Sequence, residues 1–155
     1  MGEALKQRLK QTRFESTLQE ALLNLMVAAG HVRDRVERVC EEHGITHGQY
    51  NVLRILKGVY PEGHARCDIA SRMIERAPDV TRLIDRLEDQ GLVERDRSDK
   101  DRRLSITRIT PKGLDLLEKM RPQIEAVHQY FGERISLSDR RELSRICEGL
   151  YSQEE

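Results

Sequence analysis

Apolar residues recur through the first third of the chain at alternating spacings of four and three. Between Phe14 and Cys40 the series is Leu18, Leu22, Leu25, Ala29, Val32, Val36 and Val39. This a/d pattern is typical of a helix that buries one stripe against other helices. Such a helix extends about 40 Å at 1.5 Å per residue, which is too long for a small domain to cover alone. We expect it to pack against other long helices, including helices of another chain.

Three short helices are predicted to follow. Gly44 is typical of a helix end and Thr46 of a helix start, so the first helix covers about 47–58. The second covers 67–76, and the third covers 78–91, with Pro78 in its first turn and Gly91 ending it. The positions expected to face a core are Tyr50, Leu53, Ile55 and Leu56 in the first helix, Ile69, Ala70, Met73 and Ile74 in the second, and Val80, Leu83, Ile84 and Leu87 in the third.

A β-hairpin is predicted after the third helix. Residues 92–97 and 104–110 have strand character, and the segment 98–101, "SDKD", joins them. Leu104 and Ile106 alternate properly, but Arg108 would take the next inward position, so we expect the second strand to end or bulge there. Thr110 followed by Pro111 then marks a strong helix start.

Two further helices complete the chain. The first is heptad-patterned, and the second is expected to turn Leu143, Ile146 and Leu150 inward. The predicted fold is therefore mainly α with a small β-hairpin wing. A winged helix-turn-helix core, residues 46–110, is flanked by an N-terminal dimerisation arm, 1–45, and by C-terminal dimerisation helices, 111–155. All three parts form one structural domain.

Composition agrees with this architecture. The chain has 155 residues, of which 37% are hydrophobic and 35% are charged, a balance that suits long amphipathic helices. The N-terminus lacks the apolar stretch of a secretory signal, and no run is long enough to span a membrane. The three cysteines, Cys40, Cys67 and Cys147, are an odd number without CxxC spacing. We therefore expect a cytoplasmic protein with reduced thiols and no membrane partner.

Positive charge is concentrated around the predicted hairpin, although the formal net charge of the chain is zero. Residues 95–112 carry seven lysines and arginines against three aspartates, a local excess of four. Because the distribution of charge sets the local field, a zero total does not exclude binding to nucleic acid. A solvated, charged hairpin without such a partner is the simpler alternative.

The third short helix occupies the position of the helix that reads DNA in a helix-turn-helix, where its N-terminal half meets base edges in the major groove. We predict that Asp79, Thr81 and Arg82 lie at the bases, that Arg86 lies closer to a phosphate, and that Pro78 belongs to the same exposed, DNA-facing side. Arginine can pair with guanine, aspartate with cytosine and the threonine methyl with thymine. The alternative is a surface helix whose arginines pair with its own aspartates.

The hairpin tip follows the reading helix after one strand and can reach the adjacent minor groove. Arginine is favoured there, because a narrow minor groove concentrates negative potential. We therefore predict that Arg97, Arg102 and Arg103 contact DNA. Asp99 or Asp101 is expected to brace a neighbouring arginine, so that the wing keeps its shape and loses less entropy on binding.

The stretch "DVTRLIDRLEDQGLVERDRSDKDRRLSITRITPKG" strongly resembles the MarR family of bacterial transcription factors. "VTRLIDRLEDQGLVER" is similar to the recognition helix and first wing strand of that family. "DRR" at 101–103 and "ITPKG" at 109–113 are similar to its wing tip and to the start of its next dimerisation helix. Many members have Ser or Thr where this chain has Ala77 and Pro78.

The resemblance implies a homodimer that dimerises through its first, fifth and sixth helices and binds palindromic operators in double-stranded DNA. Such proteins are usually repressors that small ligands or oxidants release from the operator. By position, Asp101 and Arg103 match the wing aspartate and arginine of the family, and Thr81 and Arg82 match base- or phosphate-contacting positions. The family usually places its effector between the winged lobe and the arms, which corresponds here to the middle of the first helix and the start of the second, around His31 and Tyr50.

Other functions remain as alternatives. The sequence contains no phosphate loop, GxSxG or HExxH motif that would indicate an enzyme, and no cofactor is predicted. A metal-sensing or redox-sensing regulator of the same fold is possible, since "CEEHGITH" gathers potential zinc ligands and three cysteines are present. The candidate ligands are Cys40, Glu41, Glu42, His43 and His47. A winged-helix module that binds protein would instead require an apolar reading face.

Overall fold

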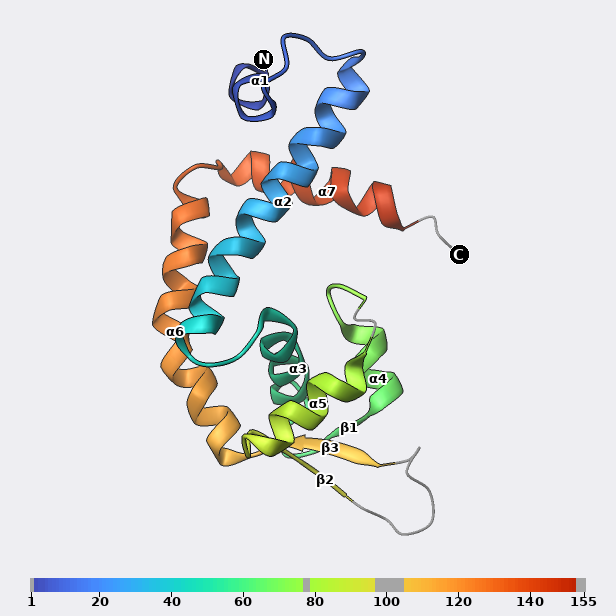
Figure 1. The fold of residues 1–155 in the computed structure, drawn as a ribbon, viewed down its shortest axis with the longest axis vertical. Coiled ribbons are helices and arrows are strands. Elements are labelled where there is room, and N and C mark those ends of the chain that lie inside the picture. Colours follow the sequence, from blue (N-terminus) through green and yellow to red (C-terminus); the bar gives the residue numbers. More distant parts are fainter. Residues whose placement is uncertain (1, 77–78, 97–104, 153–155) are drawn as a thin grey trace.

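The computed structural model describes residues 2–76, 79–96 and 105–152 (Figure 1). The fold is mainly helical with a small antiparallel sheet, so the predicted fold class is confirmed. The elements in chain order are α1 (Glu3–Leu9), α2 (Thr17–Glu42), α3 (His47–Lys57), β1 (His64–Ala65), α4 (Arg66–Arg72), α5 (Val80–Asp89), β2 (Val93–Arg95), β3 (Ile106–Ile109), α6 (Pro111–Gly132) and α7 (Leu137–Tyr151).

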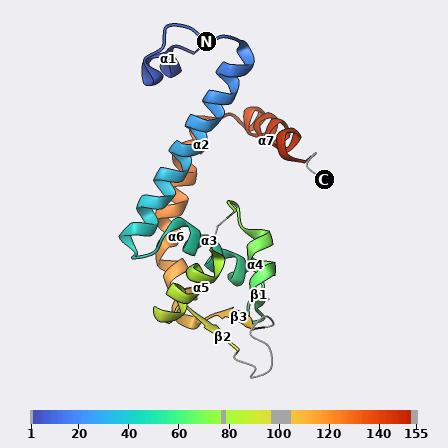
Figure 2. The same cartoon turned by 45° about the vertical axis from the view of Figure 1, so that its right-hand side comes forward.

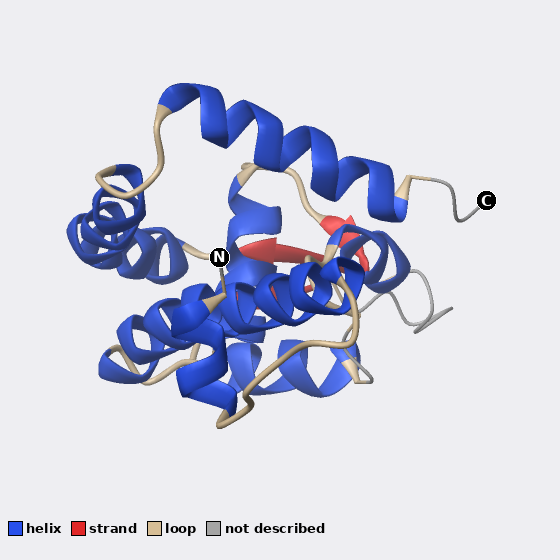
Figure 3. Cartoon of the chain, turned by 90° about the horizontal axis from the view of Figure 1, so that it is seen from above, coloured by secondary structure: helices blue, strands red, loops and turns tan. Residues whose placement is uncertain are grey.

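Long helices extend from a compact lobe at one end of the molecule. Helices α2 and α6 pack side by side, while α3, α4, α5 and the sheet form the lobe (Figures 1 and 2). Arms and lobe share one hydrophobic core, which includes Val39 of α2, Leu53 and Leu56 of α3, Ile84 of α5 and Met120 of α6. Helix α7 leads away from the end of α6 (Figure 3) and lies apart from the lobe (Figures 1 and 2).

The helix boundaries follow the capping residues of the sequence. Thr46 and Gln49 form a reciprocal capping box at the start of α3. Thr110 caps α6, and Pro111 takes the first helical position, as predicted. Gly44 and Gly91 follow α2 and α5 with φ of 74° and 70°, a conformation that glycine adopts without steric cost. Each therefore turns the chain directly into the next element.

Two predicted helix ends were wrong. Helix α4 stops at Arg72, and Ile74, expected in the core, is 77% exposed. Its backbone N–H donates to the Asn51 side chain at 2.8 Å, so a tertiary hydrogen bond replaces the continuing helix. Helix α5 begins at Val80 with Asp79 as its cap, and Pro78, expected in the first turn, precedes the cap and lies outside the described residues.

The sheet contains a strand that was not predicted. Its order is β1-β3-β2, and both pairings are antiparallel. The expected break at Arg108 was also wrong, because Thr107 and Ile109 take the buried positions and β3 continues to Ile109. Arg108 lies on the opposite face, where it forms an ion pair with Asp96. The predicted alternation was therefore shifted by one residue.

The expected inward face of the last helix was wrong for a single chain. Helix α7 has no buried residue. Leu143, Ile146 and Leu150 are all exposed. Within the part of the chain that the structure describes, nothing covers this apolar face.

Candidate nucleic-acid interface

Helix α5, the predicted reading helix, buries one face and exposes the other. Val80, Ile84 and Leu87 are buried in the lobe. The opposite side exposes Asp79, Thr81, Arg82, Arg86 and Asp89. The predicted readout residues other than Pro78 therefore all lie on the solvent side of one helix, as a groove-binding helix requires.

Asp79 has a structural role that the sequence did not reveal. Its carboxylate oxygen Oδ1 accepts the backbone N–H of Arg82 at 2.9 Å, which satisfies one of the otherwise unpaired amides at the helix start. Asp79 thereby fixes where α5 begins and places Thr81 and Arg82 in its first turn.

The arginines of α5 are not paired within the helix. Among the described residues, neither Arg82 nor Arg86 forms an ion pair. One candidate partner, Asp85, is instead engaged by Arg95 of β2. The alternative of a self-neutralised surface helix therefore loses its main support.

Arg95 joins the first wing strand to the reading helix. Its Nε donates to Glu88 at 2.9 Å and its Nη2 donates to Asp85 at 2.6 Å. The side chain is only 24% exposed, and the hydrogen bond to Glu88, with a smaller contribution from Asp85, raises the pKa of the Arg95 guanidinium. We call this group, Arg95 with Asp85 and Glu88, the wing clamp. It holds the strand against the helix.

Replacing Arg95 with methionine is expected to lower the free energy of unfolding by about 1–3 kcal/mol, because two carboxylates lose a charged donor. Arg145→Met is the matched control. Its pair with Glu142 is well exposed, so its removal should change the free energy of unfolding much less. Urea denaturation measures both. Equal destabilisation of the two variants would contradict the wing clamp.

A second brace lies at the base of the wing. Arg108 of β3 forms an ion pair with Asp96, just after β2, and the hydrogen bond that Arg108 donates to the Asp96 carboxylate raises the pKa of Arg108. A brace of this kind is predicted for Asp99 or Asp101. The observed brace uses Asp96, which comes earlier in the chain. The predicted wing residues, Arg97, Asp99, Asp101, Arg102 and Arg103, lie outside the described residues.

In the described part of the chain, the two residues suggested for an effector lie in different surroundings. Tyr50 lines a groove between α3 and α6, together with His128 and Arg121, and its volume is about 240 Å³. His31 does not line that groove. It lies instead on α2 against Phe131 at 6.0 Å between ring centroids, beside a Tyr130 ring that Arg35 and Arg134 both contact.

A different groove occupies the predicted region, the middle of α2 and the start of α3. Arg33 and Glu37 border it from α2, Thr46 to Gly48 and Asn51 border it from α3, and the linker 73–76 with Leu83 completes it. Its volume is about 280 Å³. Arg33 Nε lies 3.3 Å from a Glu75 carboxylate oxygen, so an ion pair joins the arm to the turn that precedes the reading helix.

The three cysteines and the candidate zinc ligands were the possible sensor residues. Cys40 is fully buried, and burial, with a contribution from Glu37, raises the pKa of its thiol to about 12. It is therefore protonated and unreactive at neutral pH. Cys67 is exposed and Cys147 is half-buried. Across the described ranges, no group of three or more His, Cys, Asp or Glu side chains is arranged to hold a metal ion, including the group from Cys40 to His47.

None of the helices within the described residues has the length and apolar character needed to cross a lipid bilayer.

Comparison with known proteins supports the winged helix-turn-helix arrangement of the lobe. The chain matches the model of the MarR family over residues 45–105. It is 38% identical to a MarR transcription factor from Planctomyces limnophilus, over 88% of this chain and 98% of that one, with a TM-score of 0.68. The fold is also similar to S. aureus MepR in complex with DNA, with 21% identity over 85% and 96% of the two chains and a TM-score of 0.72. For CouR from Rhodococcus jostii RHA1, bound to p-coumaroyl-CoA, the identity is 22%, the coverage is 88% and 95%, and the TM-score is 0.73.

The lobe and its polar reading helix define a winged helix-turn-helix DNA-binding protein. The match to the Planctomyces protein extends over most of both chains, and it narrows this class to one family. The chain belongs to the MarR family of transcriptional regulators.

Proposed function

We propose that this regulator acts as a homodimer on a palindromic operator and that it is a repressor. The observation that carries the proposal is the exposed face of α5, which presents Thr81, Arg82 and Arg86. Among the described residues the two arginines form no ion pair, and the wing clamp occupies Asp85. A rigidly held helix with exposed arginines suits major-groove readout. In this proposal the protein acts by binding and changes no covalent bond, so it is not an enzyme.

The apolar faces of the arms support the homodimer. On α2, Leu18, Leu22, Met26 and Val32 are exposed, and on α7 the exposed residues are Leu137, Leu143, Ile146, Leu150 and Tyr151. Contiguous apolar surface of this kind is unusual on a monomer. A second copy related by a two-fold axis would cover both faces with identical contacts. Residues 1–45 and 111–155 are therefore proposed as the dimerisation arms of the lobe at 46–110.

The dimer would present two reading helices to one side of a duplex. Half-sites one helical turn apart require the two helices to be about 34–36 Å apart. In this arrangement Asp79, Thr81 and Arg82 meet base edges, and Arg86 meets a phosphate. We place Pro78 beside this contact, and we place Arg97, Arg102 and Arg103 in the minor groove with Asp99 or Asp101 as their brace.

A small-molecule effector would act through the contact between arm and lobe. The Arg33–Glu75 ion pair crosses the groove between α2, α3 and the linker 73–76, so a ligand bound there would change how the reading helix is held. Tyr50 in the neighbouring groove and His31 on α2 stay as candidate contacts. A coupling of about 1–3 kcal/mol changes operator affinity about 5–150-fold, which is enough for release.

Salt dependence tests the proposal against a protein-interaction role. Affinity for a random duplex should fall steeply as salt rises, with a log–log slope of about −0.9 for each phosphate contact. Fluorescence anisotropy across a range of potassium chloride concentrations measures the slope. Absence of binding to duplex at low salt would favour the protein-interaction module, although the polar face of α5 argues against it.

A further inference from the structure

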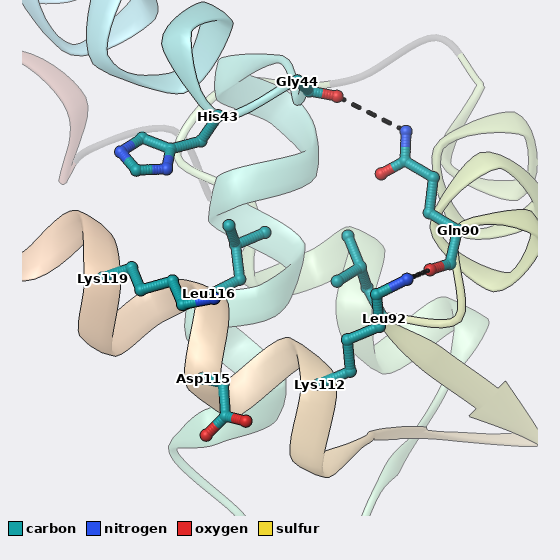
Figure 4. A pocket seen from close by; sticks show the side chains of 8 residues that line it. All are labelled: His43, Gly44, Gln90, Leu92, Lys112, Asp115, Leu116 and Lys119. Carbon is teal, nitrogen blue, oxygen red and sulfur yellow. Dashed lines mark hydrogen bonds between the residues drawn. The ribbon is translucent and has the colours of Figure 1, made fainter.

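A groove on the flank of the lobe lies where α2 and α5 end and α6 begins (Figure 4). Its volume is about 410 Å³, within the range of small-molecule sites, and it is larger than the two grooves described above. Its lining residues are His43, Gly44, Gln90, Leu92, Lys112, Asp115, Leu116 and Lys119. None of them belongs to the exposed face of α5 or to the apolar faces of the arms. We call it the flank groove.

The α6 wall of the flank groove alternates cation, apolar residue and cation. Lys112, Leu116 and Lys119 stand at positions i, i+4 and i+7, which share one face of a helix. At 1.5 Å per residue, the two lysine backbones are about 10 Å apart. Leu116 lies between the two lysines along this face, and with the almost fully buried Leu92 it supplies the apolar part of the lining.

The charges of the lining favour an anion. The lining contains two lysines and one aspartate, and the Asp115 carboxylate points away from His43 and Gln90 (Figure 4). Among the described residues, Lys119 forms no ion pair. Lys112 Nζ donates to the carbonyl of Gln90 at 2.7 Å, and an ammonium group has two more donors. Both lysines therefore retain capacity for a ligand.

We propose that the flank groove binds an elongated organic dianion, an apolar chain with a carboxylate at each end. One carboxylate binds Lys112, the other binds Lys119, and the chain lies over Leu116 and Leu92. Charge-assisted hydrogen bonds fix the ends, and burial of the chain against the two leucines adds apolar contact.

Such a ligand would act on the reading helix through Gln90. The Gln90 backbone carbonyl accepts from Lys112, and its side-chain amide donates to the carbonyl of Gly44 at 3.4 Å. Gln90 thus ties the end of α5 to both α6 and the end of α2. A dianion that draws Lys112 away loosens this tie and lowers operator affinity. This regulatory step rests on the proposed function, whereas binding to the groove does not.

Calorimetric titration of the full chain with octanedioate, octanoate and octanediol tests the binding step. The three probes share one chain length and carry two, one and no carboxylates. We expect octanedioate to bind at least about tenfold more tightly than octanoate, since octanoate lacks one charge-assisted contact, and we expect octanediol not to bind. Equal affinities for octanedioate and octanoate would overturn recognition at both ends.

Lys119→Met tests the location. It should reduce octanedioate affinity to the level of octanoate, while Lys57→Met, which removes an exposed lysine of another groove, should leave the affinity unchanged. Circular dichroism confirms that each variant is folded. Unchanged binding by folded Lys119→Met would overturn the site.

Operator binding tests the regulatory step separately. Octanedioate should lower the operator affinity of the native chain about fivefold or more and should have no such effect on Lys119→Met. Calorimetric binding without any change in operator affinity would overturn the regulation. A chain that binds octanedioate but no DNA under any condition would contradict the proposed function and leave the binding site standing.

Discussion

Leu22→Glu and Ile146→Glu are each expected to convert a dimer into monomers and to weaken operator binding roughly a thousandfold. Both side chains belong to the exposed apolar faces of α2 and α7. A buried glutamate at a two-fold interface appears twice and has no partner there, so its desolvation opposes association. Linking two binding modules increases affinity by about 10²–10⁴, and a monomer loses that gain.

Ile74→Glu provides the matched control for this pair. Ile74 is even more exposed than Leu22 or Ile146, but it lies in the linker before α5 and outside the two arm faces. Its replacement should leave the oligomeric state unchanged. Light scattering at micromolar concentration gives the mass of each variant. A native chain that scatters as a monomer, or arm variants that stay dimeric, would contradict the proposed interface.

Replacing Arg82 with alanine is expected to weaken operator binding about 10–100-fold, since a bidentate contact to a base contributes about 1–3 kcal/mol of discrimination. Arg82 stands in the first turn of α5, directly beyond the capping Asp79, and no acidic residue among the described ones holds it. Folding and dimerisation should be unchanged. The loss should affect the operator far more than a random duplex.

Arg86→Ala separates the two proposed roles on the same helix. A phosphate contact carries no sequence information, so this variant should lose affinity for operator and random duplex alike and should reduce the salt slope by about one. Arg121→Ala, on the exposed side of α6, is the control for loss of surface charge. If Arg82→Ala binds its operator as tightly as the native chain, the readout assignment is wrong.

Much of the fold could be predicted because local chemistry and tertiary structure agree. Thr46 and Thr110 cap the helices that follow them, and Gly44 and Gly91 end the helices that precede them. The buried face of α5 follows from helical spacing alone. Each of these features depends on residues within one or two turns of chain, which is the range over which sequence patterns are reliable.

The errors arise where a distant partner decides the outcome. Strand β1 has only two residues and exists because β3 offers a free edge to His64 and Ala65. Helix α4 ends early because the side chain of Asn51, on another helix, accepts a hydrogen bond from the backbone N–H of Ile74. The apolar face of α7 has no partner in its own chain, so its spacing predicts burial that one chain does not provide.

The wing clamp was missed for the same reason. Helical spacing suggests Asp85 as a partner for the arginines of its own helix, whereas its ion pair comes from Arg95, ten residues later on β2. A usable signal was present: the tight turn at Gly91 folds the strand back on α5, so a basic residue on that strand can face the acids of the helix. Among the described residues neither Arg82 nor Arg86 forms an ion pair, so both are available for the proposed contacts with DNA.

Selection of bound duplexes from a random pool tests the central claim most directly. Two α5 helices held by one dimer should enrich an inverted repeat whose half-sites are centred about 10 base pairs apart, one turn of the double helix. The same pool offered to the Ile146→Glu variant should yield no such repeat. Enrichment of a single unrepeated site by the native chain, or no enrichment at all, would contradict the proposal that a two-fold symmetric dimer recognises the operator.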